Sequence, residues 1–555
     1  ISENEKPKLK NAYKVYTADF VNTEDGTGIV HTAVMYGQDD FELGTKVSLP
    51  KHHTVNLEGK FIKGTGFLEG RFVKPARTTD VVQSGGEKDD VAIDIIKDLA
   101  RRGLLLKKEK YAHSYPHCWR CHTALIYYAR DSWYIKMSSP AIKKQLISEN
   151  KKINWEPDYI RDGRFGEWLK DIKDWAISRE RYWGTPLPAW ICDKCNEKHV
   201  IGSLKDLKNH TKKSNNKYFV MRHGEAENNA KNIYSSDQKI NHLTEKGRAE
   251  VIKTAKALKN KKITKIFSSP FLRTRETAEI VADMVNFQKD KIIYDDRIRE
   301  LEFGSFSERS AQDYWDFMKG KTWTFDTKVP GGESFQDGKQ RFGDFLYEID
   351  QKNKGENILI ISHGLSVELV PAVIEGADKE RSLEIFHSKI KNRTASLHGE
   401  HELVPLPHNA EYELDLHRPY IDDISLVCSC GGNLARVREV MDVWFDSGSM
   451  PFAQDHYPFD FAQGKSFARR KLLYPADYIC EAIDQTRGWF YTLHAIGVLM
   501  GRGRAYKNVI CLGHLLDANG KKMSKSIGNV VDPWEMIEKY GVDTLRLWMY
   551  SVNQP

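Results

Sequence analysis

The sequence has no long hydrophobic run and little cysteine. No stretch approaches the roughly 18 apolar residues that a membrane-spanning helix requires, and the first residues lack the apolar core of a secretory signal. We therefore expect neither an integral membrane protein nor a secreted one. The eight cysteines include three close pairs, which in a large chain without secretion signals indicate metal ligands rather than disulfides. A reducing, cytoplasmic environment is the matching expectation.

Length and charge set further bounds. A chain of 555 residues is long enough for about three or four domains. Its net charge of +7 suits a polyanionic partner without requiring one. Because the sequence begins with Ile1 rather than methionine, we expect a fragment of a longer protein.

A short basic loop near the end of the chain is the first candidate site. It contains Lys522, Met523, Ser524, Lys525 and Ser526. The preceding Gly520 suits a tight turn that needs a positive φ angle. Two ammonium groups on such a loop can neutralise the charge that develops on a departing pyrophosphate. For an arbitrary pair of lysines, a solvated basic loop would be the simpler interpretation.

A second candidate lies upstream, in residues 474–500, whose pattern predicts a strand, a turn and a helix. Glu481, Asp484 and Gln485 fall where the strand ends and the helix begins, the usual ligand position in open α/β sheets. The alternative is that they are carboxylates favoured by the helix dipole. Residues 436–454 predict a strand followed by a loop, with Trp444 and Asp446 where the strand ends.

Together, EAIDQTRGWFYTL (481–493) and KMSKS (522–526) resemble class I aminoacyl-tRNA synthetases of the isoleucyl type. The resemblance implies that Glu481, Asp484 and Gln485 bind the amino acid and adenylate, and that Trp444 lines the isoleucine pocket. It implies that the lysine loop binds ATP, accompanied by Mg²⁺, with isoleucine and tRNA(Ile) as the other partners. The first signature of that family, of the HxGH type, occurs nowhere in these residues.

The N-terminal segment predicts strands and tight turns over residues 19–44 and 60–73, followed by a helix over residues 91–108. Taken alone, its candidate residues could be a strand histidine, His31, and a surface acidic pair that includes Asp40. However, EDGTGIVHTAVMYGQDD (24–40) resembles the β-barrel editing domain of the same synthetases. There Asp40 would hold the α-ammonium of a misacylated amino acid, and His31 would line the pocket.

Two of the cysteine pairs predict one metal site. Cys192 and Cys195 form a CxxC knuckle, and Cys428 and Cys430 precede two glycines that let backbone amides turn toward the sulfurs. We expect these four thiolates to hold one Zn²⁺.

The third pair, Cys118 and Cys121, is half of a zinc site. In the isoleucyl family its partner pair lies upstream. We therefore expect the pair to bind metal poorly here, and two reduced structural cysteines are an equally good interpretation.

A different pattern fills the gap between the zinc-ligand pairs. Strands alternate with helices over residues 217–406, and polar residues follow the strands, as in an α/β sheet. RHG (222–224), LTEKG (243–247), SSPFLRTRET (268–277), RELEFG (299–304) and SHG (362–364) occur in that order. A neutral imidazole can attack phosphorus while arginines hold the equatorial oxygens and a carboxylic acid protonates the leaving oxygen.

This order of motifs resembles the histidine phosphatase superfamily, which includes the phosphoglycerate mutases. By that resemblance His223 is the nucleophile, Glu300 is the proton donor, and Arg222, Arg273 and His363 form the phosphate pocket. The phosphorylated substrate is open, and a decayed insert kept as a spacer is the alternative.

The combined prediction is an α/β multidomain chain: a Rossmann-type catalytic half, a β-barrel editing domain and an inserted α/β phosphatase domain. The expected segments are a partial editing domain (1–108), the return to the catalytic core (109–190), a zinc segment (191–216 and 407–435), the insert (217–406), the catalytic half (436–530) and the start of a helical region (531–555). We expect an isoleucine–tRNA ligase with hydrolytic editing, inactive as this piece alone. The rival functions are a phosphohydrolase and a tRNA-binding module.

Overall fold

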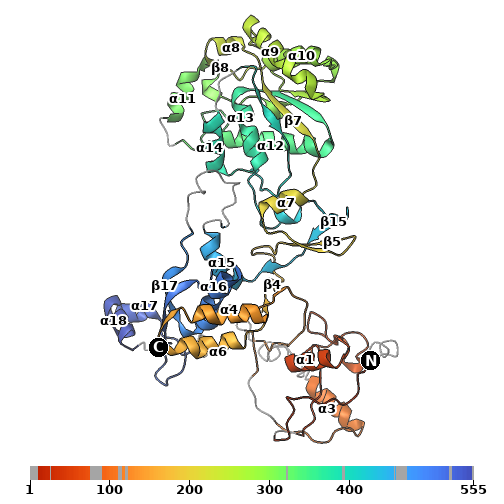
Figure 1. Ribbon diagram of the computed structural model, residues 1–555, viewed down its shortest axis with the longest axis vertical. Helices are drawn as coiled ribbons and strands as arrows, with labels where there is room; N and C mark the ends of the chain where they lie inside the picture. The colour runs from red at the N-terminus through yellow and green to blue at the C-terminus, as the bar shows by residue number, and fades with distance from the viewer. Residues whose placement is uncertain are drawn as a thin grey trace, which may run out of the picture. The chain divides into compact units, whose positions relative to one another are not determined.

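The computed structural model describes residues 11–24, 27–74, 91–110, 115–118, 123–319, 323–389, 394–454, 457, 472–523 and 528–552. The chain divides into two compact units. Figure 1 colours the chain by residue number from the N-terminus to the C-terminus. The first unit joins residues 1–132 to residues 514–553, and the second contains residues 133–513 with the last two residues.

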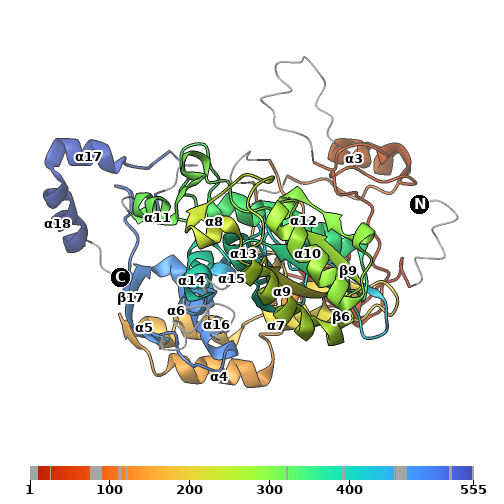
Figure 2. The same ribbon diagram turned by 90° about the horizontal axis from the view of Figure 1, so that it is seen from above.

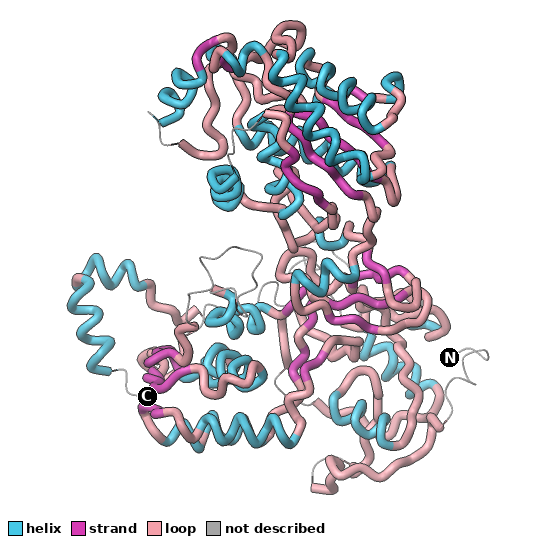
Figure 3. Tube along the Cα trace, turned by 45° about the horizontal axis from the view of Figure 1, so that its top comes forward, coloured by secondary structure: helices cyan, strands magenta, loops and turns pink. Residues whose placement is uncertain are grey.

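The first unit is helix and loop where it is described (Figure 3). Its helices are α1 (Gln38–Lys46), α3 (Val91–Arg101), α17 (Pro533–Tyr540) and α18 (Val542–Val552), with a 3₁₀ turn at Gly66–Leu68. The β structure in its described residues is limited to isolated bridges such as Val55 with Phe61 and Lys60 with Phe72. Helix α3 confirms the start of the predicted 91–108 helix and ends earlier.

The strand prediction for residues 19–44 is wrong at its C-terminal part, because Gln38–Lys46 is helical. Asp39 and Asp40 lie in the first turn of α1 and Lys46 in its last, which complements the helix dipole at both ends. Leu43 and Gly44 are buried. The acidic pair therefore starts a helix, and the described residues of this segment do not form a β-barrel.

In the second unit, a parallel sheet carries the predicted catalytic half. Its strand order is β17 (Ala476–Ala482), β18 (Tyr506–Leu512) and β2 (Asn154–Glu156). Helices α4 (Pro140–Asn150), α5 (Tyr159–Asp162), α6 (Arg164–Lys170) and α16 (Trp489–Leu499) belong to the same region. Trp155, Phe165, Phe490 and Tyr506 are at most 1% exposed and join one apolar core. The predicted strand, turn and helix of residues 474–500 are confirmed.

Residues 436–454 differ from the predicted strand and loop. A two-residue strand β16 (Val440–Met441) pairs with β4 (Ser178–Arg179), and helix α15 (Val443–Ala453) follows at once. The Asp442 carboxylate starts this helix by accepting a hydrogen bond from the Trp444 backbone N–H at 2.8 Å. A second small ladder joins β1 (Tyr134–Ile135) to β3 (Trp175–Ala176).

A four-stranded antiparallel sheet brings distant parts of the chain together. Its order is β14 (Leu426–Val427), β15 (Asn433–Arg436), β5 (Ala189–Cys192) and β6 (Lys198–Val200). Leu434 of β15 lies opposite Cys192 of β5. Helix α7 (Leu204–His210) contributes Leu207 to the apolar cluster beneath this sheet. Thr211, directly after α7, forms an isolated antiparallel bridge with Leu426 of β14. The chain segments before and after the predicted insert therefore lie side by side.

The insert is built on a five-stranded sheet of order β10-β9-β12-β7-β13. The strands are β7 (Lys217–Arg222), β9 (Lys265–Ser268), β10 (Ile293–Tyr294), β12 (Asn357–Ser362) and β13 (Leu397–His401). Strands β10, β9, β12 and β7 run parallel to one another, and β13 is antiparallel to β7. A short ladder of β8 (Ile233–Tyr234) and β11 (Arg309–Ser310) lies outside this sheet.

Helices cover both faces of the five-stranded sheet. Along β7, Tyr218 and Val220 join the core beneath α12 (Phe335–Lys352) and α13 (Gly364–Glu375). The alternate residues Phe219 and Met221 join the core beneath α9 (Glu245–Leu258) and α10 (Leu272–Val285). Figure 2 shows α9 and α10 next to one another. This alternation with a period of two confirms the predicted α/β sheet.

The remaining helices of the insert are α8 (Glu227–Ala230), α11 (Ala311–Lys319) and α14 (Lys379–Lys389). Local sequence sets several helix ends: Ser334 caps α12 together with Asp337, and Gly376 ends α13 at a φ of 65°. In the described part of the chain, no helix combines the length and apolar character that crossing a membrane requires.

Candidate functional site

The parallel pairing of β7 with β12 places two histidines side by side. Arg222 at the end of β7 lies opposite Ser362 at the end of β12, so His223 and His363 follow at the same edge of the sheet. The His223 backbone N–H donates to the Ser362 carbonyl at 3.0 Å. The two imidazole rings are 5.2 Å apart between centroids, and both side chains are almost fully buried. The two predicted motifs therefore form one site.

His223 is held as a neutral imidazole with one nitrogen available. Its Nδ1 lies 2.7 Å from the Gly224 carbonyl oxygen, which only accepts, so Nδ1 carries the proton and Nε2 keeps its lone pair. Burial lowers the pKa of His223 well below its ordinary value, and the nearby guanidinium groups of Arg273 and Arg222 act in the same direction. A neutral imidazole with a free lone pair is the form that can attack phosphorus.

His363 is fixed from its far side. Its Nε2 lies 2.8 Å from the Ser269 hydroxyl oxygen, and Phe271 packs edge-on against the ring. Burial and the charge of Arg273 lower the pKa of His363 well below its ordinary value. The Nδ1 atom is buried without a hydrogen-bond partner among the described residues.

The two arginines carry buried donors that lack protein partners. Arg273 is 2% exposed and donates from Nη2 to the Ser235 carbonyl at 3.2 Å. Within the described residues, its Nε and Nη1 and the Nε of Arg222 have no acceptor. Burial lowers the pKa of Arg273 to about 10, which still leaves it charged at neutral pH. Unpaired buried guanidinium donors are costly, so this arrangement suits an anion with several acceptor oxygens.

Glu300 joins the site at the N-terminus of α13. Its carboxylate accepts hydrogen bonds from the Leu365 and Ser366 backbone N–H groups at 3.4 and 3.3 Å and from the Ser366 hydroxyl at 3.2 Å. It is 7% exposed and lines the same cavity as His223 and both arginines. The predicted proton donor is therefore beside the predicted nucleophile.

The cavity measures about 40 Å³. Its other lining residues include Phe303 of the RELEFG motif and, outside the motifs, Asn228, Tyr234, Ser235, Leu365 and Glu368. Tyr234 and Phe303 stack at 4.3 Å and form an apolar wall. The residues outside the motifs come from α8, β8, a loop and α13, and a single sequence carries no signal that separates them from ordinary packing residues.

The synthetase candidates are grouped where β17 ends. Glu481 and Asp484 are exposed, and Gln485 Oε1 accepts from the Trp489 backbone N–H at 2.9 Å. A Cβ atom added at Gly488 would lie 2.6 Å from Gln485 Oε1 and 3.2 Å from the Trp444 ring. The structure thus brings Trp444 and Gln485 together around a glycine that cannot be enlarged. Asp446 lies on α15, and burial raises its pKa.

The lysine loop begins on a tight turn. Gly520 has a φ of 72°, as predicted, and its N–H donates to the Asp517 carbonyl at 2.9 Å. The exposed Lys522 ammonium lies 3.4 Å from His514 Nε2, and Met523 is partly exposed. Ser524, Lys525 and Ser526 lie outside the described residues.

The two editing candidates, His31 and Asp40, lie in different local structures. His31 is exposed in a loop, whereas Asp40 lies in α1 with its carboxylate folded back toward Gly37. The editing pocket at these positions stays a prediction.

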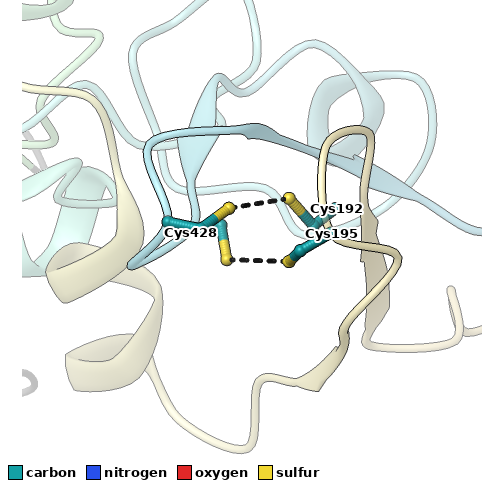
Figure 4. A group of neighbouring side chains, drawn as sticks. Cys192, Cys195 and Cys428 are labelled. Atoms are coloured by element: carbon teal, nitrogen blue, oxygen red, sulfur yellow. Dashed lines mark hydrogen bonds between the residues drawn. The ribbon is translucent and has the colours of Figure 1, made fainter.

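The four predicted metal ligands converge, as Figure 4 shows for Cys192, Cys195 and Cys428. All four sulfurs, including that of Cys430, lie within 4.8 Å of one another. Two of these separations are 3.5 Å (Cys192 to Cys430) and 3.8 Å (Cys195 to Cys428). A tetrahedral zinc ion with Zn–S bonds of about 2.3 Å requires sulfur separations of about 3.8 Å. The donor set therefore fits Zn²⁺.

Within this cluster the surroundings favour the thiolate of Cys192, whereas the neighbouring thiols raise the pKa of Cys195 and Cys430. The Cys195 backbone N–H is the main group that lowers the pKa of the Cys192 thiol, to about 7. His199 Nε2 lies 3.4 Å from Cys428 Sγ. Of the remaining pair, Cys118 is partly exposed and Cys121 lies outside the described residues.

Comparison with known proteins assigns both architectures. The family model "tRNA synthetases class I (I, L, M and V)" matches residues 12–247 and 384–554, and the model "Histidine phosphatase superfamily (branch 1)" matches residues 218–400. The first match covers more than half of the chain, so the chain belongs to the class I tRNA synthetase family. Within it lies a segment of the histidine phosphatase superfamily.

The curated relatives narrow the comparison within that family. The chain is 32% identical to "Isoleucine--tRNA ligase" of Dehalococcoides mccartyi over 98% of its own length and 32% of the relative. It is also 32% identical to the Thermus thermophilus protein of the same name, over 99% of the chain and 31% of the relative. The chain thus spans about a third of the length of these relatives.

Among solved structures, "Bacillus stearothermophilus YhfR" is similar at 21% identity and a TM-score of 0.28. It covers 40% of this chain and 95% of that one. A similarity at this score supports no conclusion, and the phosphatase assignment rests on the family-model match and the geometry of the site.

Metal analysis tests the cysteine cluster. We expect one zinc per chain in the purified protein. Cys428→Ser should lose that zinc because three thiolates cannot complete the closed tetrahedron. Cys480→Ser is the matched control, since Cys480 is a free cysteine outside the cluster. Inductively coupled plasma mass spectrometry after dialysis measures the ratio, and tight stoichiometric zinc that persists in both Cys192→Ser and Cys428→Ser would contradict the assignment.

Proposed function

We propose that this chain supplies the amino-acid side of the active site of an isoleucine–tRNA ligase. The observation that carries the proposal is its 32% identity to isoleucine–tRNA ligases over 98% of its length. The position of Glu481, Asp484 and Gln485 at the end of β17, beside Trp444, supports it. The reaction would join isoleucine to tRNA(Ile), with ATP converted to AMP and diphosphate.

The proposed chemistry is positioning and charge stabilisation. The isoleucine carboxylate attacks the α-phosphorus of ATP in line, its new O–P bond replaces the bond to diphosphate, and the aminoacyl group then passes to a tRNA hydroxyl. Trp444 would line the side-chain pocket, and the exposed Glu481 and Asp484 would hold the ammonium and adenylate groups. Lys522 and Lys525 would neutralise the departing diphosphate together with Mg²⁺.

Hydrolytic editing is a further proposal, which rests on the motif alone. One methylene in an apolar pocket changes binding by about 1–3 kcal/mol, which is too little to exclude valine from an isoleucine site. A second, hydrolytic site would supply the missing discrimination, with Asp40 holding the ammonium and His31 beside it. We also propose the segment boundaries given under Sequence analysis, with the insert placed at residues 217–406.

We expect the 555-residue chain alone to show no isoleucine-dependent exchange of pyrophosphate into ATP. The reason is that no HxGH sequence occurs in it, and the resemblance assigns that motif to the ATP side of the site. The assay would use radiolabelled pyrophosphate with the full-length Thermus thermophilus ligase as positive control. Exchange above the isoleucine-free background by this chain would overturn the expectation.

The second proposed function is phosphohydrolysis by the insert. It is favoured by His223, Arg222, Arg273 and Glu300, which line one cavity, and by His363, whose ring lies 5.2 Å from that of His223. His223 Nε2 attacks phosphorus, the ester P–O bond breaks, and Glu300 gives its proton to the leaving oxygen. The positive charge stays on the phosphorylated ring, whose Nδ1–H still donates to Gly224. Glu300 then takes a proton from water, the water oxygen attacks phosphorus, and the N–P bond breaks to release phosphate and neutral His223.

Substitution of the nucleophile tests this function. We expect slow hydrolysis of p-nitrophenyl phosphate by the chain and a loss of roughly a thousandfold or more in His223→Ala, because the covalent step is removed. His417→Ala is the matched control, since His417 is exposed on the surface. Colorimetric release of p-nitrophenol measures both, and hydrolysis that is unchanged in His223→Ala would refute the assignment of His223.

A further inference from the structure

The cavity of the insert contains two acceptor groups that the phosphohydrolase mechanism does not use. Glu368, in the second turn of α13, is 5% exposed and lines the cavity. Asn228 is also 5% exposed and lines it. The Asn228 Nδ2 group donates to the Ile233 carbonyl at 3.0 Å, which fixes the amide orientation. Its Oδ1 is then buried without a hydrogen-bond donor among the described residues.

Glu368 is held in place from behind. His398 on β13 places Nδ1 3.3 Å from Glu368 Oε1, and its Nε2 lies 2.9 Å from the Ser396 hydroxyl. This contact supports one oxygen of the carboxylate from the side of the sheet. His398 is therefore a positioning residue, whereas Glu368 itself lines the cavity.

A phosphate monoester alone would not match these groups. The two guanidinium charges of Arg222 and Arg273 are matched by the two charges of a phosphate dianion, and Glu300 acts as the proton donor. Glu368, whose Oε1 already contacts His398 Nδ1, then remains as a further acceptor in the cavity, and Asn228 Oδ1 remains as an unpaired acceptor. A buried acceptor is costly without a donor, so this side of the cavity suits a ligand group that brings several donors.

We propose that the insert hydrolyses phosphate monoesters of short amino alcohols, whose ammonium group is bound by Glu368 and Asn228. The proposal rests on the phosphohydrolase function proposed above. Glu368 and Asn228 line the same cavity as Arg222 and Arg273. The ammonium group must therefore follow the ester oxygen after a short chain.

A matched pair of substrates tests this. O-phosphoethanolamine and n-propyl phosphate have the same chain length and differ by an ammonium group in place of a methyl group. We expect kcat/KM to favour O-phosphoethanolamine by at least roughly tenfold, because a site built around acceptors rejects an analogue without the donor. In Glu368→Gln the preference should disappear, because the ammonium group loses its carboxylate partner. Glu380→Gln, an exposed glutamate on α14, should keep the preference.

The other outcomes distinguish failure of the substrate class from failure of the phosphohydrolase function. Equal hydrolysis of both esters by the parent chain, or a preference that survives in Glu368→Gln, would overturn the substrate class and leave the phosphohydrolase function intact. Hydrolysis of p-nitrophenyl phosphate but of neither ester would overturn the substrate class alone, and hydrolysis of none of the three would overturn both. If Glu368→Gln is inactive toward n-propyl phosphate as well, Asn228→Ala and His398→Gln decide the question. A weakened preference in these variants supports the proposal, and an unchanged preference overturns it.

Discussion

The parallel pairing of β7 with β12 is the constraint on which the insert depends. This register puts Arg222 opposite Ser362, and so delivers His223 and His363 to one edge of the sheet from segments far apart in the sequence. Arg273 and Glu300 come to the same place from α10 and from the loop before α11. Burial then decides the chemistry: it keeps both imidazoles neutral and leaves guanidinium donors unpaired, an arrangement that is unfavourable unless an anion enters.

A second strand pairing explains how one chain contains both a synthetase part and a phosphatase-like insert. The pairing of β5 with β15 joins the chain before the insert to the chain after it. The four thiols converge at this sheet. Synthetase-type sequence lies on both sides of this pairing, as the two separate ranges of the family match show. Because the chain segments before and after the insert pair at Thr211 and Leu426, the insert extends a loop without separating the strands that the synthetase part needs. A metal ion held by both segments would strengthen this pairing.

The sequence predicted the insert better than the N-terminal segment, for a physical reason. Apolar runs such as YFVM (218–221) and ILII (358–361) can only be strands covered on both faces. The motifs then had to meet where those strands end.

Residues 38–46 mix acidic, apolar and glycine residues without a clear period, and tertiary packing of Leu43 and Gly44 made them helical. Residues 443–453, with glycine and proline inside, were also helical because Asp442 caps them. Glu368 and Asn228 could not be predicted, because their role follows from the shape of the cavity.

The central claim is that His223 is a neutral, buried nucleophile that accepts a phosphoryl group. The most direct measurement is to mix the chain with a reactive phosphate monoester, quench in alkali and map the bound phosphate by mass spectrometry. The account predicts an alkali-stable, acid-labile phosphoryl group on His223 that is absent from the His223→Ala chain. A phosphoryl group on another residue, or none in the parent chain while hydrolysis proceeds, would contradict it.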